Sequence, residues 1–291
     1  MSNLPTLVNV PPFLIRDLKD KDLTFLKKVK IIVLGKFLGI VIKITKGHLF
    51  CTLMNLFFKS DGKIIYENKQ YIKFKDNLKV IHYPNKRILR VVKSLDYQLD
   101  LIISSYCLDQ IDFKNDDIVI DCGANVGELN LALKKRNLDL IYYAFEPDEE
   151  TFQSLKLNNS ENIDFLYKLG LSNKNAKINF YLDTDGGNSS IINFGSKDVV
   201  EIQAITLDSI QIEKKIKLFK VEAEGYEPEV LEGAKSTLRF IEYISVDFGP
   251  ERGVNSENTV VKVNNILTEA GFELVEFSNY RVIGLYRNKS E

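Results

Sequence analysis

Hydrophobic and polar residues alternate in a regular way from residue 117 to the end of the chain. Short apolar runs rich in β-branched residues are typical of strands, and they occur at 118–120, 140–145, 163–167, 176–182, 217–221 and 243–246. Apolar residues at helical spacing predict helices at 128–136, 148–158, 228–238 and 256–270. Two last runs, 272–277 and 282–286, predict a hairpin. This order predicts an α/β fold, with a doubly wound parallel sheet, helices on both faces and an antiparallel C-terminal hairpin.

The first part of the chain has a different pattern. Three short β-type runs, 63–66, 70–74 and 78–83, are followed by a helical stretch near 99–111. We therefore expect two regions: a smaller helical and β-rich (α+β) extension over 1–110, and the α/β domain over 111–291.

Residues 1–60 are strongly basic, with ten lysine and arginine residues against three aspartates. The most apolar stretch, 31–44, is interrupted by Lys36 and Lys43 and is shorter than the roughly 20 residues that span a bilayer. We favour a helical cap whose apolar side packs on the main domain and whose lysines are solvated. The alternative is a peripheral contact with an anionic membrane surface through residues 27–46.

The composition narrows the function classes. Of 291 residues, 45% are hydrophobic and 27% charged, which is typical of a globular protein and excludes dominant disorder. A net charge of −1 argues against a dedicated nucleic-acid binder. Three cysteines cannot form a disulfide framework, so we expect a cytoplasmic protein, with membrane association as an alternative. Only His48 and His82 are present, which argues against a metal site built from several histidines.

The strongest local signal is the loop 121–127, Asp-Cys-Gly-Ala-Asn-Val-Gly, between a predicted strand and a predicted helix. Gly123 and Gly127 allow a tight turn and a close approach of a ligand to the backbone. The following helix would direct backbone N–H groups at a ligand carboxylate. Asp121 ends the strand, where it could face a ligand ammonium group.

A second acid, Glu146, follows the next strand, about 20 residues after the glycine loop, where an acid accepts hydrogen bonds from ribose hydroxyls. A dinucleotide site is the simplest alternative, but the GxGxxG pattern is absent. The spacing suits a nucleoside that carries an amino acid, such as S-adenosylmethionine.

Five motifs in this order resemble the FkbM family of S-adenosylmethionine-dependent methyltransferases; they are residues 121–127, 144–147, 206–210, 219–227 and 230–234. The resemblance covers roughly residues 115–275. It implies the class I methyltransferase (Rossmann-like) fold, with a seven-stranded sheet of six parallel strands and one antiparallel strand. It also implies O-methylation of hydroxyls on sugars, glycans, glycolipids or polyketides.

Carried over by position, the resemblance places Asp121, Gly123, Asn125 and Gly127 around the methionine part of S-adenosylmethionine, and Glu146 at the ribose. One departure stands out: the family usually has Asp-Val before its Glu-Gly pair, where this chain has Glu222 followed by Ala223. Glutamate is one methylene longer, which puts in doubt any role that needs a fixed carboxylate position.

Methyl transfer to an alcohol needs a group that takes the hydroxyl proton. Three carboxylates follow the late strands, Glu222, Glu224 and Asp247, and we expect them to form the catalytic set. Either Glu222 or Glu224 could be the base or the acceptor anchor, while Glu224 or Glu227 could instead cap the following helix. A divalent metal held by the catalytic set is an alternative, but we assign no metal site.

Neighbouring residues leave further alternatives open. Lys220 either orients a carboxylate or, as we slightly favour, is solvated or faces a helix. Residues 188–190 either line the acceptor pocket or form a hairpin tip.

Three other functions compete with a methyltransferase that acts on a small-molecule or glycan acceptor. They are a nicotinamide (NAD-type) oxidoreductase, a non-catalytic binding module on the same fold and a nucleic-acid methyltransferase. The absent GxGxxG disfavours the first and the intact glycine loop the second. The acidic balance outside the N-terminal segment disfavours the third. The sequence does not decide the oligomeric state.

Overall fold

The computed structural model describes residues 10–18, 23–183, 189–278 and 281–290. The chain forms two compact units, residues 1–98 and 99–291. The division between them lies earlier than the expected one at residue 110, within the helix α3 (Leu95–Ser105).

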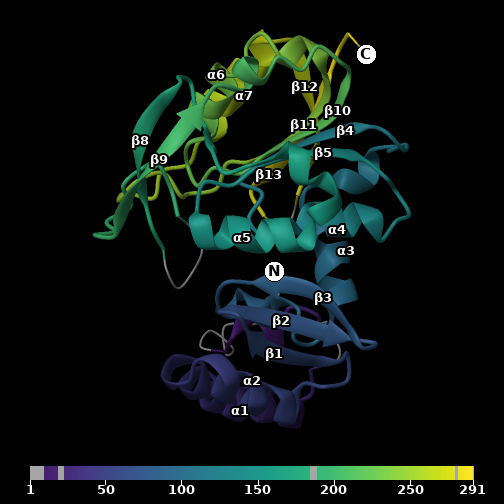
Figure 1. Cartoon of the computed structure of the whole chain (residues 1–291), viewed down its shortest axis with the longest axis vertical. Helices are drawn as coiled ribbons and strands as arrows, with labels where there is room; N and C mark the ends of the chain where they lie inside the picture. Colours follow the sequence, from purple (N-terminus) through teal and green to yellow (C-terminus); the bar gives the residue numbers. More distant parts are fainter. Residues whose placement is uncertain (1–9, 19–22, 184–188, 279–280, 291) are drawn as a thin grey trace. The chain divides into compact units, whose positions relative to one another are not determined.

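The first unit combines two helices with a small antiparallel sheet. After a 3₁₀ turn at Pro12–Leu14 come α1 (Phe25–Ile44) and α2 (Gly47–Phe57), which lie side by side (Figure 1). The strands β1 (Lys63–Glu67), β2 (Gln70–Lys75) and β3 (Leu78–Tyr83) pair in sequence order, which confirms the three predicted β runs. Helix α2 packs against β1, and a 3₁₀ turn at Lys86–Arg90 follows β3.

The second unit is built on a seven-stranded sheet in the order β12-β13-β11-β10-β4-β5-β6. Its strands are β4 (Ile118–Cys122), β5 (Ile141–Phe145), β6 (Leu166–Tyr167), β10 (Ile216–Val221), β11 (Ile241–Asp247), β12 (Phe272–Phe277) and β13 (Ile283–Asn288). Strand β13 pairs antiparallel with β11 and with β12, and all other neighbouring pairs in this sheet are parallel. The structure therefore confirms the doubly wound, class I (Rossmann-like) architecture and the C-terminal hairpin.

Helices cover both faces of this sheet: α4 (Glu128–Lys134) and α5 (Glu149–Asn158) lie on one side, and α6 (Glu227–Glu232) and α7 (Val260–Glu269) on the other (Figure 1). Helix α4 is two residues shorter than predicted, and α6 and α7 differ more. Helix α6 ends at Gly233, where a Cβ would lie 1.9 Å from the Ser172 carbonyl oxygen, so the turn packs directly on another backbone. Helix α7 begins at Val260 instead of residue 256.

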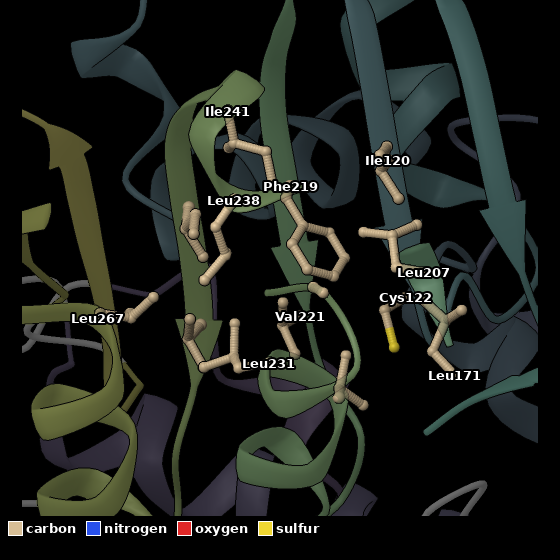
Figure 2. Close-up of a cluster of buried hydrophobic side chains, with 14 of the residues drawn as sticks. Ile120, Cys122, Leu171, Leu207, Phe219, Val221, Leu231, Leu238, Ile241 and Leu267 are labelled. Carbon is tan, nitrogen blue, oxygen red and sulfur yellow. The ribbon is translucent and has the colours of Figure 1, made fainter. Parts of the chain in front are cut away.

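The main core lies between the sheet and the α6–α7 side. Phe219 and Val221 of β10 project into it, between the side chains of β4 and those of β11 (Figure 2). Leu231 of α6 and Leu267 of α7 close it, and both are fully buried. Because the central strands are buried on both faces, they read as continuous apolar runs and are easily found in the sequence.

A second sheet of three strands, β7 (Gly170–Leu171), β9 (Val199–Ile205) and β8 (Ala176–Tyr181), is inserted between β6 and β10. The sequence pattern indicated β8 but not β9. The predicted strand 163–167 is wrong for its first part, because residues Ser160–Phe165 form a 3₁₀ turn that leaves only β6. Shorter 3₁₀ turns occur at Leu108–Gln110, Leu207–Ile210 and Leu238–Phe240.

Candidate functional site

The glycine loop turns directly after β4 and passes against the end of β10. Gly123 has φ +69°, and a Cβ there would lie 2.0 Å from the Glu222 carbonyl oxygen. No other residue fits this close approach without moving the backbone. The loop that was expected to hold the methionine part is therefore also in contact with the segment that carries the expected catalytic carboxylates.

Glu146 links this loop to the segment after β5. Its Oε2 accepts the Asn125 N–H at 2.9 Å and its Oε1 accepts the Asp148 N–H at 2.9 Å. Burial raises the pKa of Glu146 to about 7. Each carboxylate oxygen has a second lone pair, so two backbone donors leave room for a diol.

Gly127 has a different role from Gly123. Its φ is +80°, and a Cβ there would lie 2.0 Å from Nδ2 of Asn159, a residue that follows α5. Asn158 adds a hydrogen bond from its Nδ2 to the Val126 carbonyl. Gly127 thus lets α4 start close against the end of α5, and no described contact connects it to the carboxylates.

Lys220 occupies the centre of a buried charge network. Its Nζ lies 2.9 Å from Asp121 Oδ1 and 3.1 Å from Glu222 Oε2, and it donates to the Gly123 carbonyl at 2.9 Å. Only 3% of Lys220 is exposed, so the favoured interpretation of a solvated or helix-facing lysine is wrong. Burial alone would lower the pKa of Lys220, but the charges of Asp121 and Glu222 hold it well above its usual value.

Asp121 is deeply buried and is held by two neighbouring side chains. It is 1% exposed, and Tyr142 donates its hydroxyl to Oδ2. Burial raises the pKa of Asp121, against the opposing charge of Lys220. Its visible role is to fix Lys220 beneath the glycine loop.

Glu222 is held by three donors. Arg281 Nη2 lies 2.6 Å from Oε1, while Tyr106 and Lys220 both contact Oε2. Burial alone would raise the pKa of Glu222, but the charges of Lys220 and Arg281 keep it well below its usual range. Arg281 also pairs with Asp247, which ends β11, and packs over the Tyr106 ring.

A second carboxyl pair lies beside this network. The pKa of Glu251 is raised by burial and by the charges of Asp247 and Glu222, and Glu251 hydrogen-bonds to the Glu224 side chain. Two carboxyl groups hydrogen-bond only when they share a proton. Asp247 is 2% exposed, whereas Glu224 and Glu251 are half-buried, so this pair is the more accessible one.

Two structural side chains shape the segment that carries Glu224. Glu227 Oε1 accepts the N–H groups of Ala223 and Gly225, both at 3.0 Å, so Glu227 closes the turn that leads into α6. These donors lie before Pro228, as predicted, but they precede the helix, whose N-cap residue is Tyr226, so the contact does not cap α6 itself. Ser190 donates its hydroxyl to the Glu224 carbonyl at 2.9 Å, which brings the end of the 188–190 segment to the site. Asn188 lies outside the described residues.

Four site residues were not among the expected ones: Tyr106, Tyr142, Glu251 and Arg281. Tyr106 precedes the sheet and Arg281 lies between β12 and β13, so only the fold brings them together. Within the described ranges, no three histidine, cysteine or carboxylate side chains are placed to hold a metal ion.

The arrangement fits S-adenosylmethionine. Glu146 keeps acceptor capacity for ribose hydroxyls, and Gly123 lets the glycine loop beside it pack on the Glu222 backbone. The network holds three carboxylates, Asp121, Glu222 and Asp247, against the two cations Lys220 and Arg281. Acidic side chains outnumber basic ones in this network, which suits a cofactor whose sulfonium, ammonium and carboxylate sum to one positive charge.

Comparisons with known proteins agree with this interpretation. The family model described as the methyltransferase FkbM domain matches residues 121–274. Hexuronic acid methyltransferase AglP of Haloferax volcanii is 28% identical over 162 residues, which are 54% of this chain and 64% of that protein.

Two solved structures are similar over part of the chain. Methyltransferase FkbM from Methylobacillus flagellatus has 16% identity and a TM-score of 0.43 over 62% of this chain and 45% of its own. Aeropyrum pernix fibrillarin, with S-adenosyl-L-methionine bound, has 10% identity and a TM-score of 0.36. The match covers 64% of this chain and 72% of the fibrillarin chain. The FkbM family model covers more than half of the residues of this chain. The chain therefore belongs to the FkbM family of S-adenosylmethionine-dependent methyltransferases.

Proposed function

We propose that this chain methylates a hydroxyl group of a sugar or a sugar-containing acceptor such as a glycan or glycolipid, with a polyketide-type acceptor as the wider class. The observation that carries the proposal is the set of carboxylates at the ends of β10 and β11, in backbone contact with the glycine loop. The relative that acts on a hexuronic acid supports a sugar acceptor. The chain matches only 64% of that relative, so its acceptor is carried over here as a hypothesis.

At the cofactor end, we propose that Gly123 and Asn125 receive the methionine part and Glu146 binds the ribose hydroxyls. When bound, S-adenosylmethionine supplies the activated methyl group. Asp121 acts through Lys220 and is a positioning residue. Gly127 supports the loop by letting α4 and α5 pack closely.

At the acceptor end, we propose a division of roles among the carboxylates. Glu222 is a poor base because Lys220 and Arg281 keep it ionised at a low pKa. Asp247 is buried and paired with Arg281, so it positions that arginine. Glu224, half-buried and paired with Glu251, takes the acceptor proton as the new O–CH₃ bond forms.

Single-turnover methylation with labelled cofactor tests these roles, using uronic acids, nucleotide sugars and glycolipids as acceptors. We expect Glu224→Gln to slow the reaction by about 100-fold or more, as for loss of a general base. Glu222→Gln and Asp247→Asn should slow it through a displaced Arg281. Rates unchanged in all three variants would remove these carboxylates from the mechanism.

The rate profile against pH separates a base from a structural residue. The base must be deprotonated, so the rate should rise with pH through the titration of the Glu224–Glu251 pair. Glu251→Gln leaves Glu224 as the only titrating member of the pair, so the position of the rising limb should shift. A lower rate with an unmoved limb would instead give Glu251 a purely structural role.

Calorimetric titration distinguishes the remaining alternatives. S-adenosylhomocysteine should bind and NAD should not, because the loop lacks the glycines that a pyrophosphate requires. Binding of S-adenosylhomocysteine without methylation of any sugar acceptor would favour a non-catalytic module or another acceptor class.

A further inference from the structure

Helix α1 exposes large apolar side chains along one whole face. The exposed positions recur every three or four residues over the length of the helix; they are Phe25, Leu26, Val29, Val33, Phe37, Ile40 and Ile44. Val33 is 65% exposed and Ile44 74%. At 3.6 residues per turn these positions form one continuous stripe.

The opposite face of α1 is also apolar, and it is buried within the first unit. Leu38 is fully buried, and Gly35 lies so close to Val10 that a Cβ would be 2.9 Å from its side chain. The helix is therefore already attached to its own unit by one face. A helix on the surface of a soluble protein normally turns a polar face outward, so the exposed stripe needs a separate explanation.

The stripe continues onto α2. The rings of Phe37 and Phe57 lie 5.8 Å apart, and Phe57 is 46% exposed. Leu49 and Leu56, seven residues apart on the same side of α2, are also exposed. We call these three α2 residues together with the α1 stripe the α1–α2 face. Scattered exposed apolar residues are ordinary, but ten of them on two helices that contact each other mark an interaction surface.

The charged side chains of the segment that forms this face all have one sign. Between residues 23 and 60 the chain has seven lysines and no aspartate or glutamate. On the α1 wheel, Lys30 falls at one edge of the stripe and Lys36 and Lys43 at the other, and all three are exposed. Lysines at the edges of an apolar stripe can place their stems on the apolar surface and their ammonium groups at anionic headgroups.

The length and charge of α1 suit a helix that lies on a bilayer. Over the described residues, no helix is both long and apolar enough to cross a membrane. Helix α1 has 20 residues but carries five lysines, and its two apolar faces point in opposite directions. One face is used inside the protein, and the other is available to a lipid surface.

We propose that the α1–α2 face binds the surface of an anionic lipid bilayer, with the apolar stripe at the boundary between headgroups and acyl chains and the flanking lysines at the lipid phosphates. This surface lies in residues 25–57, outside the matched methyltransferase domain, and does not depend on the proposed reaction. Such a contact would hold the chain where membrane-bound acceptors are concentrated.

Vesicle co-sedimentation of the full chain tests the proposal without any methylation assay. Vesicles of phosphatidylcholine with 30% phosphatidylglycerol are compared with pure phosphatidylcholine, at low and high salt. We expect binding to the anionic vesicles, weakened by salt. Lys36→Gln with Lys43→Gln should lower the partition constant about fivefold per lysine, and Val33→Ser with Ile40→Ser by tenfold or more.

The matched control variants replace similarly exposed residues of the second unit. Leu157→Ser with Val261→Ser, and Lys177→Gln with Lys215→Gln, should bind vesicles like the unchanged protein. Circular dichroism checks that every variant is folded.

Several results would overturn the proposal. One is equal binding to neutral and anionic vesicles, and another is an equal loss of binding in the control variants. A third is a dimer in light scattering that dissociates in Val33→Ser with Ile40→Ser while vesicles are not bound. That last result would assign the face to a second copy of the chain.

Discussion

Lys220 provides the sharpest test of how the site is held together. Its ammonium group is buried, contacts Asp121 and Glu222 at 2.9 and 3.1 Å, and donates to the backbone of the glycine loop. The variant Lys220→Met keeps a side chain of similar length and apolar stem but removes the charge. It leaves two buried carboxylates without their shared cation.

Removing one partner of a buried ion pair costs about 3–5 kcal/mol, because the remaining charge loses its compensation. Glu222 has a depressed pKa in the folded protein, so its contribution to stability is present above its unfolded pKa and is lost as the pH falls through the folded value. Without Lys220 the pKa of Glu222 is lowered less. The pKa of Asp121, which burial already raises, rises further. The loss in the variant should therefore be largest near pH 7.5 and smaller near pH 5, where the carboxylates take up protons.

Denaturant unfolding followed by circular dichroism at pH 7.5 and pH 5 measures this difference. The control is Lys177→Met, which removes an exposed pair with Glu201 and should cost about 1 kcal/mol or less. The double variant Lys220→Met with Glu222→Gln should recover part of the stability at pH 7.5. A Lys220→Met protein as stable as the Lys177→Met control, with no pH dependence of the difference, would refute the reasoning.

Three further predictions concern the loop and its neighbours. Gly123→Ala should abolish S-adenosylhomocysteine binding in calorimetry and lower the free energy of unfolding by several kcal/mol, because the new Cβ would meet the Glu222 carbonyl. The control Gly271→Ala, also at positive φ but in open space, should lower the free energy of unfolding by about 1–2 kcal/mol. The affinity for S-adenosylhomocysteine should rise with pH through about 7 as Glu146 ionises, and Glu146→Gln should remove that dependence and weaken binding at pH 8. Asp208→Ala removes three hydrogen bonds from residues 236–237 and should lower the free energy of unfolding by about 1–3 kcal/mol, measured by denaturant titration.

The sheet was predictable because its central strands are buried on both faces. Ile118–Cys122 and Ile216–Val221 have few or no exposed positions, so their sequences are short apolar runs that turn signals follow. The peripheral strand β9 was not predicted. Its exposed positions carry valine as well as glutamate and glutamine, so its apolar and polar residues do not alternate regularly. Local pattern carries little information about such a strand.

The glycine loop and Glu146 were predictable for a related reason, since their chemistry depends on residues that are consecutive or one strand apart. Arg281 and Tyr106 depend instead on contacts across 59 and 116 residues, which hairpin closure and the helix before β4 create. Lys220 was misjudged because a lysine is usually exposed, and only the convergence of two acids and two carbonyl groups explains its burial.

The same contacts answer the doubt raised by glutamate at position 222. A longer side chain has more rotamers, so alone it would place its carboxylate less reproducibly than aspartate. Here each oxygen has its own donor, Oε1 from Arg281 and Oε2 from Tyr106, and Lys220 pairs with Oε2 as well. Because those three groups come from three separate segments, the carboxylate can move only if the surrounding fold moves with it. The extra methylene therefore extends the reach of the carboxylate to Arg281 and Tyr106 without making its position less defined.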